Sequence, residues 1–216
     1  GTSLMAESKP EIEYFYATHS IFAYLGSAKI QDIAHAAGRR LVHKPFDYQR
    51  VVTTSGAGST RERGKAHRDY YFGREIERWA EWRNVPIMKG FPEHHFADMD
   101  LASGVLIAAI EDGLDINGLS HCFLQAHWRD DADLSNPDTL TELIASLGMN
   151  PEALLSAART PEVLAAFKRN TDEAIQRSVF GSPTYFVDGD MFYGQDRLEF
   201  VEHALKTPFA GTWPRD

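Results

Sequence analysis

The stretch of nineteen residues from Val179 to Arg197 constrains the fold most, because it holds a proline turn, a hairpin and a helix start in direct succession. Thr184–Val187 is rich in β-forming residues, Asp188-Gly189 supplies turn chemistry, and Met191–Tyr193 returns as a second strand. A helix is expected to follow over residues 194–206. The sequence therefore predicts a β-hairpin and a helix at the carboxyl end of the chain.

The turn before the hairpin contains Ser182-Pro183. A peptide bond before proline adopts the cis form at modest cost, and a cis bond here would turn the backbone of Ser182 outward. Ser182 would then offer its N–H and C=O groups to a peptide-like ligand, which would lie across them as an added strand. On Pro183 alone, an ordinary turn with a trans bond is the more frequent arrangement.

A second strand-and-helix unit is predicted near the amino terminus. Glu11–Tyr16 is apolar and β-prone, a helix with apolar residues at helical spacing starts at Ser20 and stops before Gly38, and a strand follows over Arg40–Phe46. Because a helix amino terminus carries unsatisfied N–H groups, an anion beside Ser20 would be stabilised. Ser20 is equally well explained as a simple N-cap.

The middle of the chain is expected to be helical. The helices are predicted over residues 63–82, 98–112, 116–130, 137–147, 151–158 and 161–178, after a Gly/Ser/Thr-rich loop at 53–60. The order β-α-β, helices, β-β-α predicts an α/β chain with a thioredoxin-like fold that a large helical insertion interrupts. Residues 11–50 and 179–208 would form the thioredoxin-like domain, and residues 51–178 the inserted domain.

The loop before the first helix lacks the feature that most such folds carry. Thioredoxin-like oxidoreductases have Cys-x-x-Cys opposite the cis-proline, whereas this chain has Ser20-Ile21-Phe22-Ala23. The pattern resembles the 2-hydroxychromene-2-carboxylate isomerases and the related kappa-class glutathione transferases, in which serine replaces the cysteine and glutathione supplies the thiol. The resemblance runs from about Glu11 to Leu205. Its matching segments include Glu77–Ala80, Ala126-His127-Trp128, Asn170–Ala174, Phe180–Thr184 and Tyr193–Arg197.

The resemblance implies where glutathione would lie. The tripeptide would run along the edge at Ser182 and Pro183 with its thiol near Ser20, whose hydroxyl would stabilise the thiolate together with the helix terminus. Its γ-glutamyl end would meet the next helix start, where Asp196 suits the ammonium group. The cofactor-binding set is thus Ser20, Ser182, Pro183, Tyr193, Gly194, Gln195 and Asp196, with Ser20 as the catalytic residue.

The implied reaction is an isomerisation in which glutathione is regenerated. The thiolate adds to an unsaturated aromatic or bicyclic carboxylic acid, the ring opens, the resulting single bond rotates, and elimination restores the double bond. One alternative is a kappa-like glutathione transferase or peroxidase that consumes glutathione on an electrophilic small molecule. A second is a glutathione-binding protein without catalysis. The resemblance also implies a homodimer.

The substrate half of the site departs from the isomerases. Their first loop reads Asp-Phe-x-Ser-Pro, whereas residues 17–21 here lack both the aspartate and the proline. Of the basic residues expected near the substrate carboxylate only Arg63 remains, which is also explained as part of a solvated charge run. His95 occupies the place of a substrate tyrosine. His19 either tunes the thiol as a proton acceptor or simply faces solvent or caps the helix.

Composition restricts the class of protein. The 216 residues and 43% apolar content allow one sizeable core, and a formal charge of −9 argues against nucleic-acid binding. No apolar run predicts a membrane span, and no secretory signal is evident, so a cytoplasmic enzyme is expected. The single cysteine, Cys122, is read as a small packing residue of a helix. His94-His95 lacks a sensibly spaced third ligand, so we predict no metal site.

Overall fold

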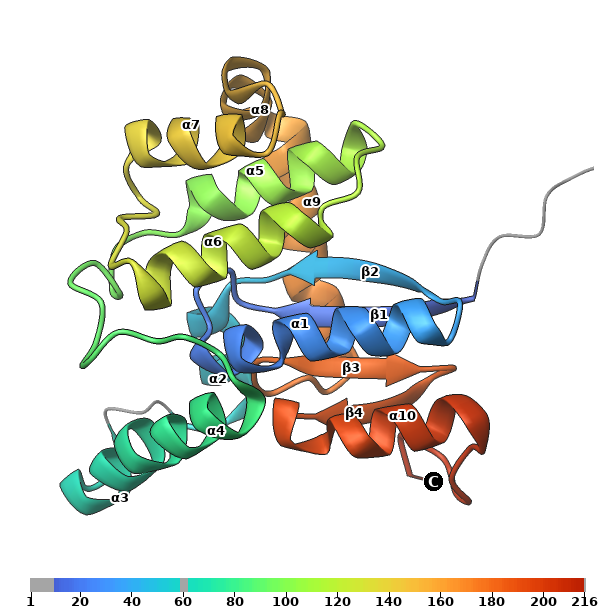
Figure 1. Ribbon diagram of the computed structural model, residues 1–216. Helices are drawn as coiled ribbons and strands as arrows, with labels where there is room; N and C mark the ends of the chain where they lie inside the picture. The colour runs from blue at the N-terminus through green and yellow to red at the C-terminus, as the bar shows by residue number, and fades with distance from the viewer. Residues whose placement is uncertain (1–9, 59–61, 216) are drawn as a thin grey trace, which may run out of the picture.

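The computed structural model describes residues 10–58 and 62–215, and it confirms the predicted thioredoxin-like α/β fold (Figure 1). A four-stranded mixed sheet in the order β2-β1-β3-β4 forms its centre. The strands are β1 (Glu11–Tyr16), β2 (Arg40–Pro45), β3 (Thr184–Val187) and β4 (Asp190–Tyr193). β1 pairs in parallel with β2 and antiparallel with β3, so the two ends of the chain meet in the middle of the sheet.

The second half of the first strand is buried on both faces, which is why it reads as an apolar run. Tyr14, Phe15 and Tyr16 are all almost fully buried. The parallel partner β2 is reached through α1 (Ile21–Ala36), as a parallel connection requires. This crossover places the amino terminus of α1 at the carboxyl end of β1.

The carboxyl-terminal hairpin forms as predicted. Asp188 and Gly189 both have positive φ angles, 51° and 90°, as a tight two-residue hairpin turn demands. The register pairs Thr184 with Tyr193, so the end of β4 lies beside the start of β3. The helix that follows begins with a 3₁₀ turn at Gln195–Arg197 and continues as α10 (Leu198–Lys206).

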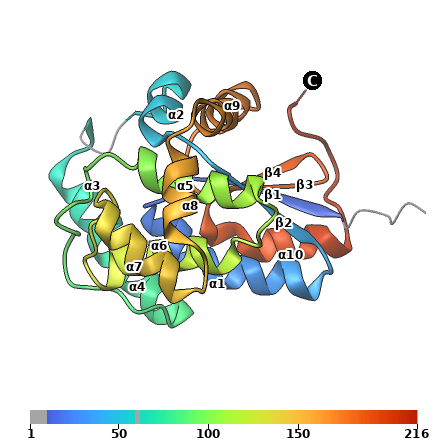
Figure 2. The ribbon, with the colours of Figure 1, turned by 90° about the horizontal axis from the view of Figure 1, so that it is seen from above.

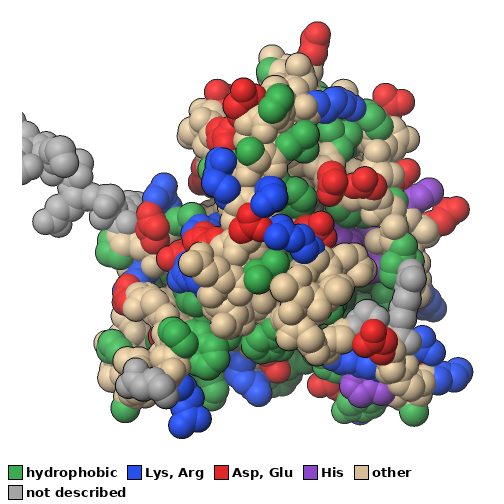
Figure 3. Space-filling model, turned by 180° about the vertical axis from the view of Figure 1, so that it is seen from behind, with side chains coloured by type: hydrophobic (Ala, Val, Ile, Leu, Met, Phe, Trp, Pro, Cys, Tyr) green, Lys and Arg blue, Asp and Glu red, His purple; other side chains and the backbone are tan. Residues whose placement is uncertain are grey.

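Helices cover both faces of the sheet. α1 and α10 lie on one face, and α2 (Tyr48–Ser55) and α9 (Pro161–Gln176) lie on the other (Figure 2). Seen from the second face, basic and acidic side chains are interspersed (Figure 3), and ion pairs join α9 to its neighbours. These pairs include Lys44 with Glu173 and Arg50 with Asp172.

The predicted helices of the insertion are confirmed to within a few residues. They are α3 (Lys65–Asp69), a π-helical turn (Tyr70–Arg74), α4 (Glu75–Arg83), α5 (Asp100–Glu111), α6 (Asn117–Arg129), α7 (Pro137–Ser146) and α8 (Pro151–Ala158), followed by α9. The last three each begin with proline after a capping side chain, from Asn136, Asn150 and Thr160.

The loop predicted at residues 53–60 is partly wrong, because residues 53–55 end the helix α2. Asp47 caps this helix by accepting a hydrogen bond from the Arg50 N–H at 3.2 Å, and Gly56 ends it in the left-handed conformation. Ser59 and Thr60 lie outside the described residues.

One hydrophobic cluster joins the sheet helices to the insertion. It runs from β1 and α1 through α5, α6, α7 and α8 without a break. The division into a 51–178 domain and a split thioredoxin-like domain therefore stays a prediction. In the part of the chain that the structure describes, no helix is long and apolar enough to cross a membrane.

Candidate active site

The loop between β1 and α1 is fastened to three separate parts of the chain. The Ala17 N–H donates to Ser182 Oγ at 3.1 Å, and Trp128 Nε1 donates to the His19 carbonyl at 2.9 Å. Thr18 Oγ1 and Ser103 Oγ, the latter on α5, are 2.8 Å apart. The cis-proline loop and two inserted helices therefore jointly position the residues that precede α1.

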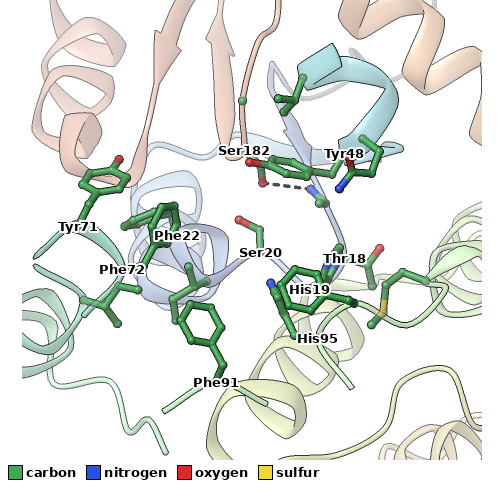
Figure 4. A pocket seen from close by; sticks show the side chains of 18 of the residues that line it. Thr18, His19, Ser20, Phe22, Tyr48, Tyr71, Phe72, Phe91, His95 and Ser182 are labelled. Carbon is green, nitrogen blue, oxygen red and sulfur yellow. Dashed lines mark hydrogen bonds between the residues drawn. The ribbon is translucent and has the colours of Figure 1, made fainter. Parts of the chain in front are cut away.

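Ser20 is the N-cap of α1, as one of the two readings of the sequence expected. Its Oγ accepts a hydrogen bond from the Ala23 N–H at 3.2 Å, which leaves the hydroxyl hydrogen to donate elsewhere. The first turn of this helix carries no acidic residue, so nothing offsets its positive end. Ser20 lines a cavity, and in Figure 4 its side chain lies between Ser182 and the ring of His19.

The Ser182-Pro183 bond is cis, as the sequence suggested. Within the described residues no hydrogen bond uses the backbone N–H or C=O of Ser182, although its hydroxyl is occupied by Ala17. Ser182 also lines the cavity. An extended peptide that ran past Ser182 would find both backbone groups unpaired, as strand addition requires.

Tyr193 and Gly194 complete this wall. The Tyr193 ring packs against Phe180 with centroids 4.6 Å apart and covers Gly181, and the side chain is 40% exposed. Burial raises the pKa of the Tyr193 phenol to about 12, so it stays a hydrogen-bond donor at neutral pH. The Gly194 N–H donates to the Pro183 carbonyl at 2.9 Å and closes the loop.

The structure places Gln195 differently from the expectation. Its side chain is only 2% exposed and does not line the cavity. Arg83 on α4 donates from Nε to Gln195 Oε1 at 2.5 Å and from Nη2 to the Gln195 carbonyl at 2.7 Å. The carboxamide oxygen is therefore taken by Arg83, and Gln195 fixes the helix start in place.

Asp196 lies on the exposed rim beside the cavity. It forms an ion pair with Arg197 at 3.2 Å, and it is close enough to Tyr71 to raise the pKa of that phenol, after burial as the larger cause. Tyr71 itself lines the cavity. The cavity lining therefore excludes Pro183, Gly194 and Asp196, which lie next to residues that do line it.

The opposite wall comes from the insertion. Arg63 lines the cavity with its guanidinium 6.0 Å from the centre of the Tyr71 ring. Tyr71 belongs to the π-helical turn, a local widening of a helix that is frequent at functional sites. The other basic residues of this run are Arg50, which pairs with Asp172, Lys65, which pairs with Asp69, and Arg61, which lies outside the described residues.

Three histidines cluster beside Ser20, and sequence reasoning missed the cluster; His19 and His95 line the cavity, and His127 is buried behind them. The ring centroids of His19 and His95 are 5.0 Å apart, and His95 Nδ1 lies 3.0 Å from His127 Nε2 on α6. His19 is largely buried, so the expectation that it faces solvent or caps the helix is wrong; the cap is Ser20. Nothing in the sequence links three positions so far apart.

Burial keeps these rings uncharged. It lowers the pKa of His19 to about 3, helped by His95 and His127, and it lowers the pKa of His95 to about 4. The pKa of His127 also falls to about 4, since burial outweighs the nearby Asp131 and Asp133. All three imidazoles are neutral at physiological pH.

The cavity between these walls has a volume of about 1880 Å³. Small-molecule sites usually measure about 300–1,000 Å³, so this space is large enough for a tripeptide and a second molecule. Phe22, Phe72 and Phe91 give it an apolar lining opposite Ser182 (Figure 4).

Cys122 does not line the cavity, and burial raises the pKa of its thiol.

Comparison with known proteins agrees with this geometry. Residues 11–206 match the family described as DSBA-like thioredoxin domain. The chain belongs to this family. This DSBA-like protein is 28% identical to a 2-hydroxychromene-2-carboxylate isomerase from Sphingobium xenophagum over 196 residues, which cover 90% of the chain and 97% of that isomerase. The resemblance inferred from the sequence is confirmed.

Two further comparisons concern a solved isomerase structure and a glutathione transferase. The structure of a 2-hydroxychromene-2-carboxylate isomerase superposes with a TM-score of 0.75 at 22% identity, covering 90% of this chain and 94% of the isomerase. Glutathione S-transferase kappa 1 from Homo sapiens is 31% identical over 94 residues, or 40% of this chain and 42% of the transferase.

In residues 10–58 and 62–215 no group of three or more His, Cys, Asp or Glu residues could hold a metal ion.

Proposed function

We propose that this protein is a glutathione-dependent isomerase of unsaturated aromatic or bicyclic carboxylic acids such as 2-hydroxychromene-2-carboxylate. The observation that carries the proposal is the N-cap Ser20, at an uncompensated helix terminus, on the same cavity as the unpaired backbone of Ser182. Without a cysteine between residues 20 and 23, the thiol must come from a bound molecule. Similarity to an isomerase over 90% of the chain supports the reaction class.

In the proposed complex, glutathione lies along Ser182 and Pro183 with its thiol beside Ser20. The Ser20 hydroxyl donates to the thiolate, and the α1 terminus stabilises the negative charge. Tyr193 packs against the peptide, while the γ-glutamyl ammonium group reaches Asp196. Gln195 acts by holding this helix start through Arg83.

The acid substrate occupies the rest of the cavity. Arg63 meets its carboxylate, and the aromatic side chains hold its ring. The thiolate adds to the conjugated double bond, the ring C–O bond breaks and its electron pair goes to the phenol oxygen, the former double bond rotates as a single bond, and elimination returns glutathione. Two subunits form the enzyme, which sedimentation of the purified protein would test.

The alternative activities are separated by following glutathione. An isomerase converts 2-hydroxychromene-2-carboxylate at constant glutathione concentration, and the reaction stops when glutathione is removed. Loss of glutathione in proportion to product, with an electrophile such as 1-chloro-2,4-dinitrobenzene, would instead establish the kappa-like transferase. Binding by calorimetry with neither reaction would leave a glutathione-binding protein.

A further inference from the structure

The π-helical turn carries an inference that rests on the proposed function and extends it. Tyr71 belongs to this turn and lines the cavity, yet the proposed complex gives it no contact with glutathione. Its neighbour Tyr70 is 53% exposed, does not line the cavity, and accepts a hydrogen bond from Arg78 Nη1 at 3.2 Å. The turn therefore places one of two adjacent tyrosines on the cavity wall.

Tyr71 lies beside the helix start that would receive the glutathione thiol. Its ring contacts that of Phe22, two residues beyond Ser20, with centroids 5.1 Å apart. In the view of Figure 4, Tyr71 and His19 lie on opposite sides of Ser20. The Arg63 guanidinium is 6.0 Å from the centre of the Tyr71 ring, and this cation makes the wall around the phenol attractive to an anion.

The carboxylate of Asp196 is close to the same phenol. Asp196 helps to raise the pKa of Tyr71, after burial as the larger cause, and it also helps to raise the pKa of Tyr193. A Cβ on Gly194 would collide with the Asp196 carboxylate, so glycine at this φ of 98° allows the carboxylate to fold back over the chain. An acidic group therefore stands next to two phenols that line the cavity.

One helix holds Tyr71 and Asp196 in place relative to each other. The π-helical turn continues directly into α4, and Arg83 at the end of α4 donates to Gln195 Oε1 and to the Gln195 carbonyl. Gln195 also packs tightly on Gly26 of α1, where an added Cβ would lie 2.7 Å from the Gln195 Cβ. Because the turn that carries Asp196 is held on two sides, less ordering is needed when a ligand binds.

The Tyr71 hydroxyl is available as a donor. Among residues 10–58 and 62–215 no hydrogen bond uses it. The raised pKa keeps the phenol neutral at physiological pH, so its O–H can donate to an anion, which a phenolate could not do. A donor between an acidic and a basic side chain suits a ligand that carries both charges on neighbouring atoms. The γ-glutamyl end of glutathione is such a ligand, since its ammonium and carboxylate groups are bonded to the same carbon.

We propose that the Tyr71 hydroxyl binds the α-carboxylate of the γ-glutamyl residue of glutathione, while Asp196 takes the ammonium group on the same carbon. The insertion thereby contributes directly to cofactor binding. A thiol that lacks this carboxylate would leave the phenol unpaired, and an unpaired donor at a half-buried site weakens binding. Tyr71 is thus a residue that selects γ-glutamyl thiols from other thiols.

Two analogues of glutathione separate the two charges. Glutaryl-cysteinylglycine keeps the carboxylate and lacks the ammonium group, whereas 4-aminobutyryl-cysteinylglycine keeps the ammonium group and lacks the carboxylate. In calorimetry, Tyr71→Phe should weaken the binding of glutathione and of the glutaryl analogue about 5–30-fold and leave the aminobutyryl analogue unchanged. Asp196→Ala should weaken the aminobutyryl analogue and leave the glutaryl analogue unchanged.

Tyr70→Phe is the matched control, because it removes a hydroxyl from the neighbouring position outside the cavity. Phenylalanine at position 71 keeps the ring that packs on Phe22, so both variants should unfold thermally like the unmodified protein. Each variant is compared with itself across the three ligands, and a general loss of structure would weaken all three alike.

The outcomes separate this inference from the proposed function. If glutathione binds and Tyr71→Phe equals Tyr70→Phe, or weakens all three ligands equally, the carboxylate contact fails and the isomerase assignment is untouched. A Tyr71→Phe variant that alters only the KM for 2-hydroxychromene-2-carboxylate also refutes the contact. If the selective loss is found but the acid is not isomerised, the isomerase assignment fails and the contact stands. Absence of glutathione binding to the unmodified protein overturns both.

Discussion

Replacing Ser20 by alanine should raise the pKa of bound glutathione by about one to two units. The structure assigns the Ser20 oxygen lone pair to Ala23 and leaves its hydrogen for the thiolate. A hydrogen bond to a charged group contributes about 1.5–3 kcal/mol, and one pKa unit corresponds to about 1.4 kcal/mol. The α1 terminus remains in the variant, so the thiol should still ionise more easily than free glutathione.

The assay is titration of the thiolate by its ultraviolet absorbance in protein saturated with glutathione. Alanine also removes the helix cap, which costs about 1 kcal/mol of stability, whereas glycine at a cap costs only a few tenths. Ser20→Gly is therefore the matched variant, because it loses the hydroxyl and nearly keeps the cap. The reasoning is refuted if both variants ionise glutathione at the same pH as the unmodified protein.

Three other changes have expected outcomes. Asp196→Ala should weaken glutathione binding a few-fold, about 1 kcal/mol or less at this exposed rim, and equal affinity in calorimetry would contradict its role. Burial lowers the pKa of His43 to about 4, below its usual 6.5, so the stability it contributes is complete above pH 6.5 and falls as the pH drops toward 4. Chemical unfolding at pH 7 and pH 5 should show a loss that is about 2 kcal/mol smaller in His43→Gln, and identical losses would rule out this account. Gly181→Ala would bring a Cβ to 2.6 Å from the Tyr193 ring, so thermal unfolding should show a loss of about 1–3 kcal/mol that Tyr193→Ala relieves; additive effects would argue against this contact.

Short sequence patterns predicted most helices and strands of the fold correctly. The Asp188-Gly189 turn, the proline starts of α7, α8 and α9, and the alternation of apolar residues each act within a few positions of the chain. The α2 helix was missed because its sequence, with two valines and two threonines, is a weak helix former. Packing of its buried Val51 and Val52 against the rest of the protein stabilises it instead.

The site was harder to predict where its contacts are distant in sequence. Gln195 resembled a ligand-facing residue because it is polar and starts a helix. Its real environment is set by Arg83, 112 positions earlier, and by Gly26, where an added Cβ would lie 2.7 Å from the Gln195 Cβ. Likewise, only the packing of α6 against the first loop brings His127 to the residues around Ser20. The hydrophobic periodicity of a sequence carries no information on a contact between residues so far apart.

The placement of charge explains why the two halves of the site need each other in the proposed reaction. Ser20 and the α1 terminus stabilise a thiolate before it reacts, which increases the amount of nucleophile but also lowers the energy of the starting state. Acceleration requires interactions that strengthen as negative charge leaves sulfur. Such interactions belong to the substrate half of the proposed site, where Arg63 lines the cavity and the charge arrives on oxygen. A protein with the first set alone would bind glutathione as a thiolate and react slowly.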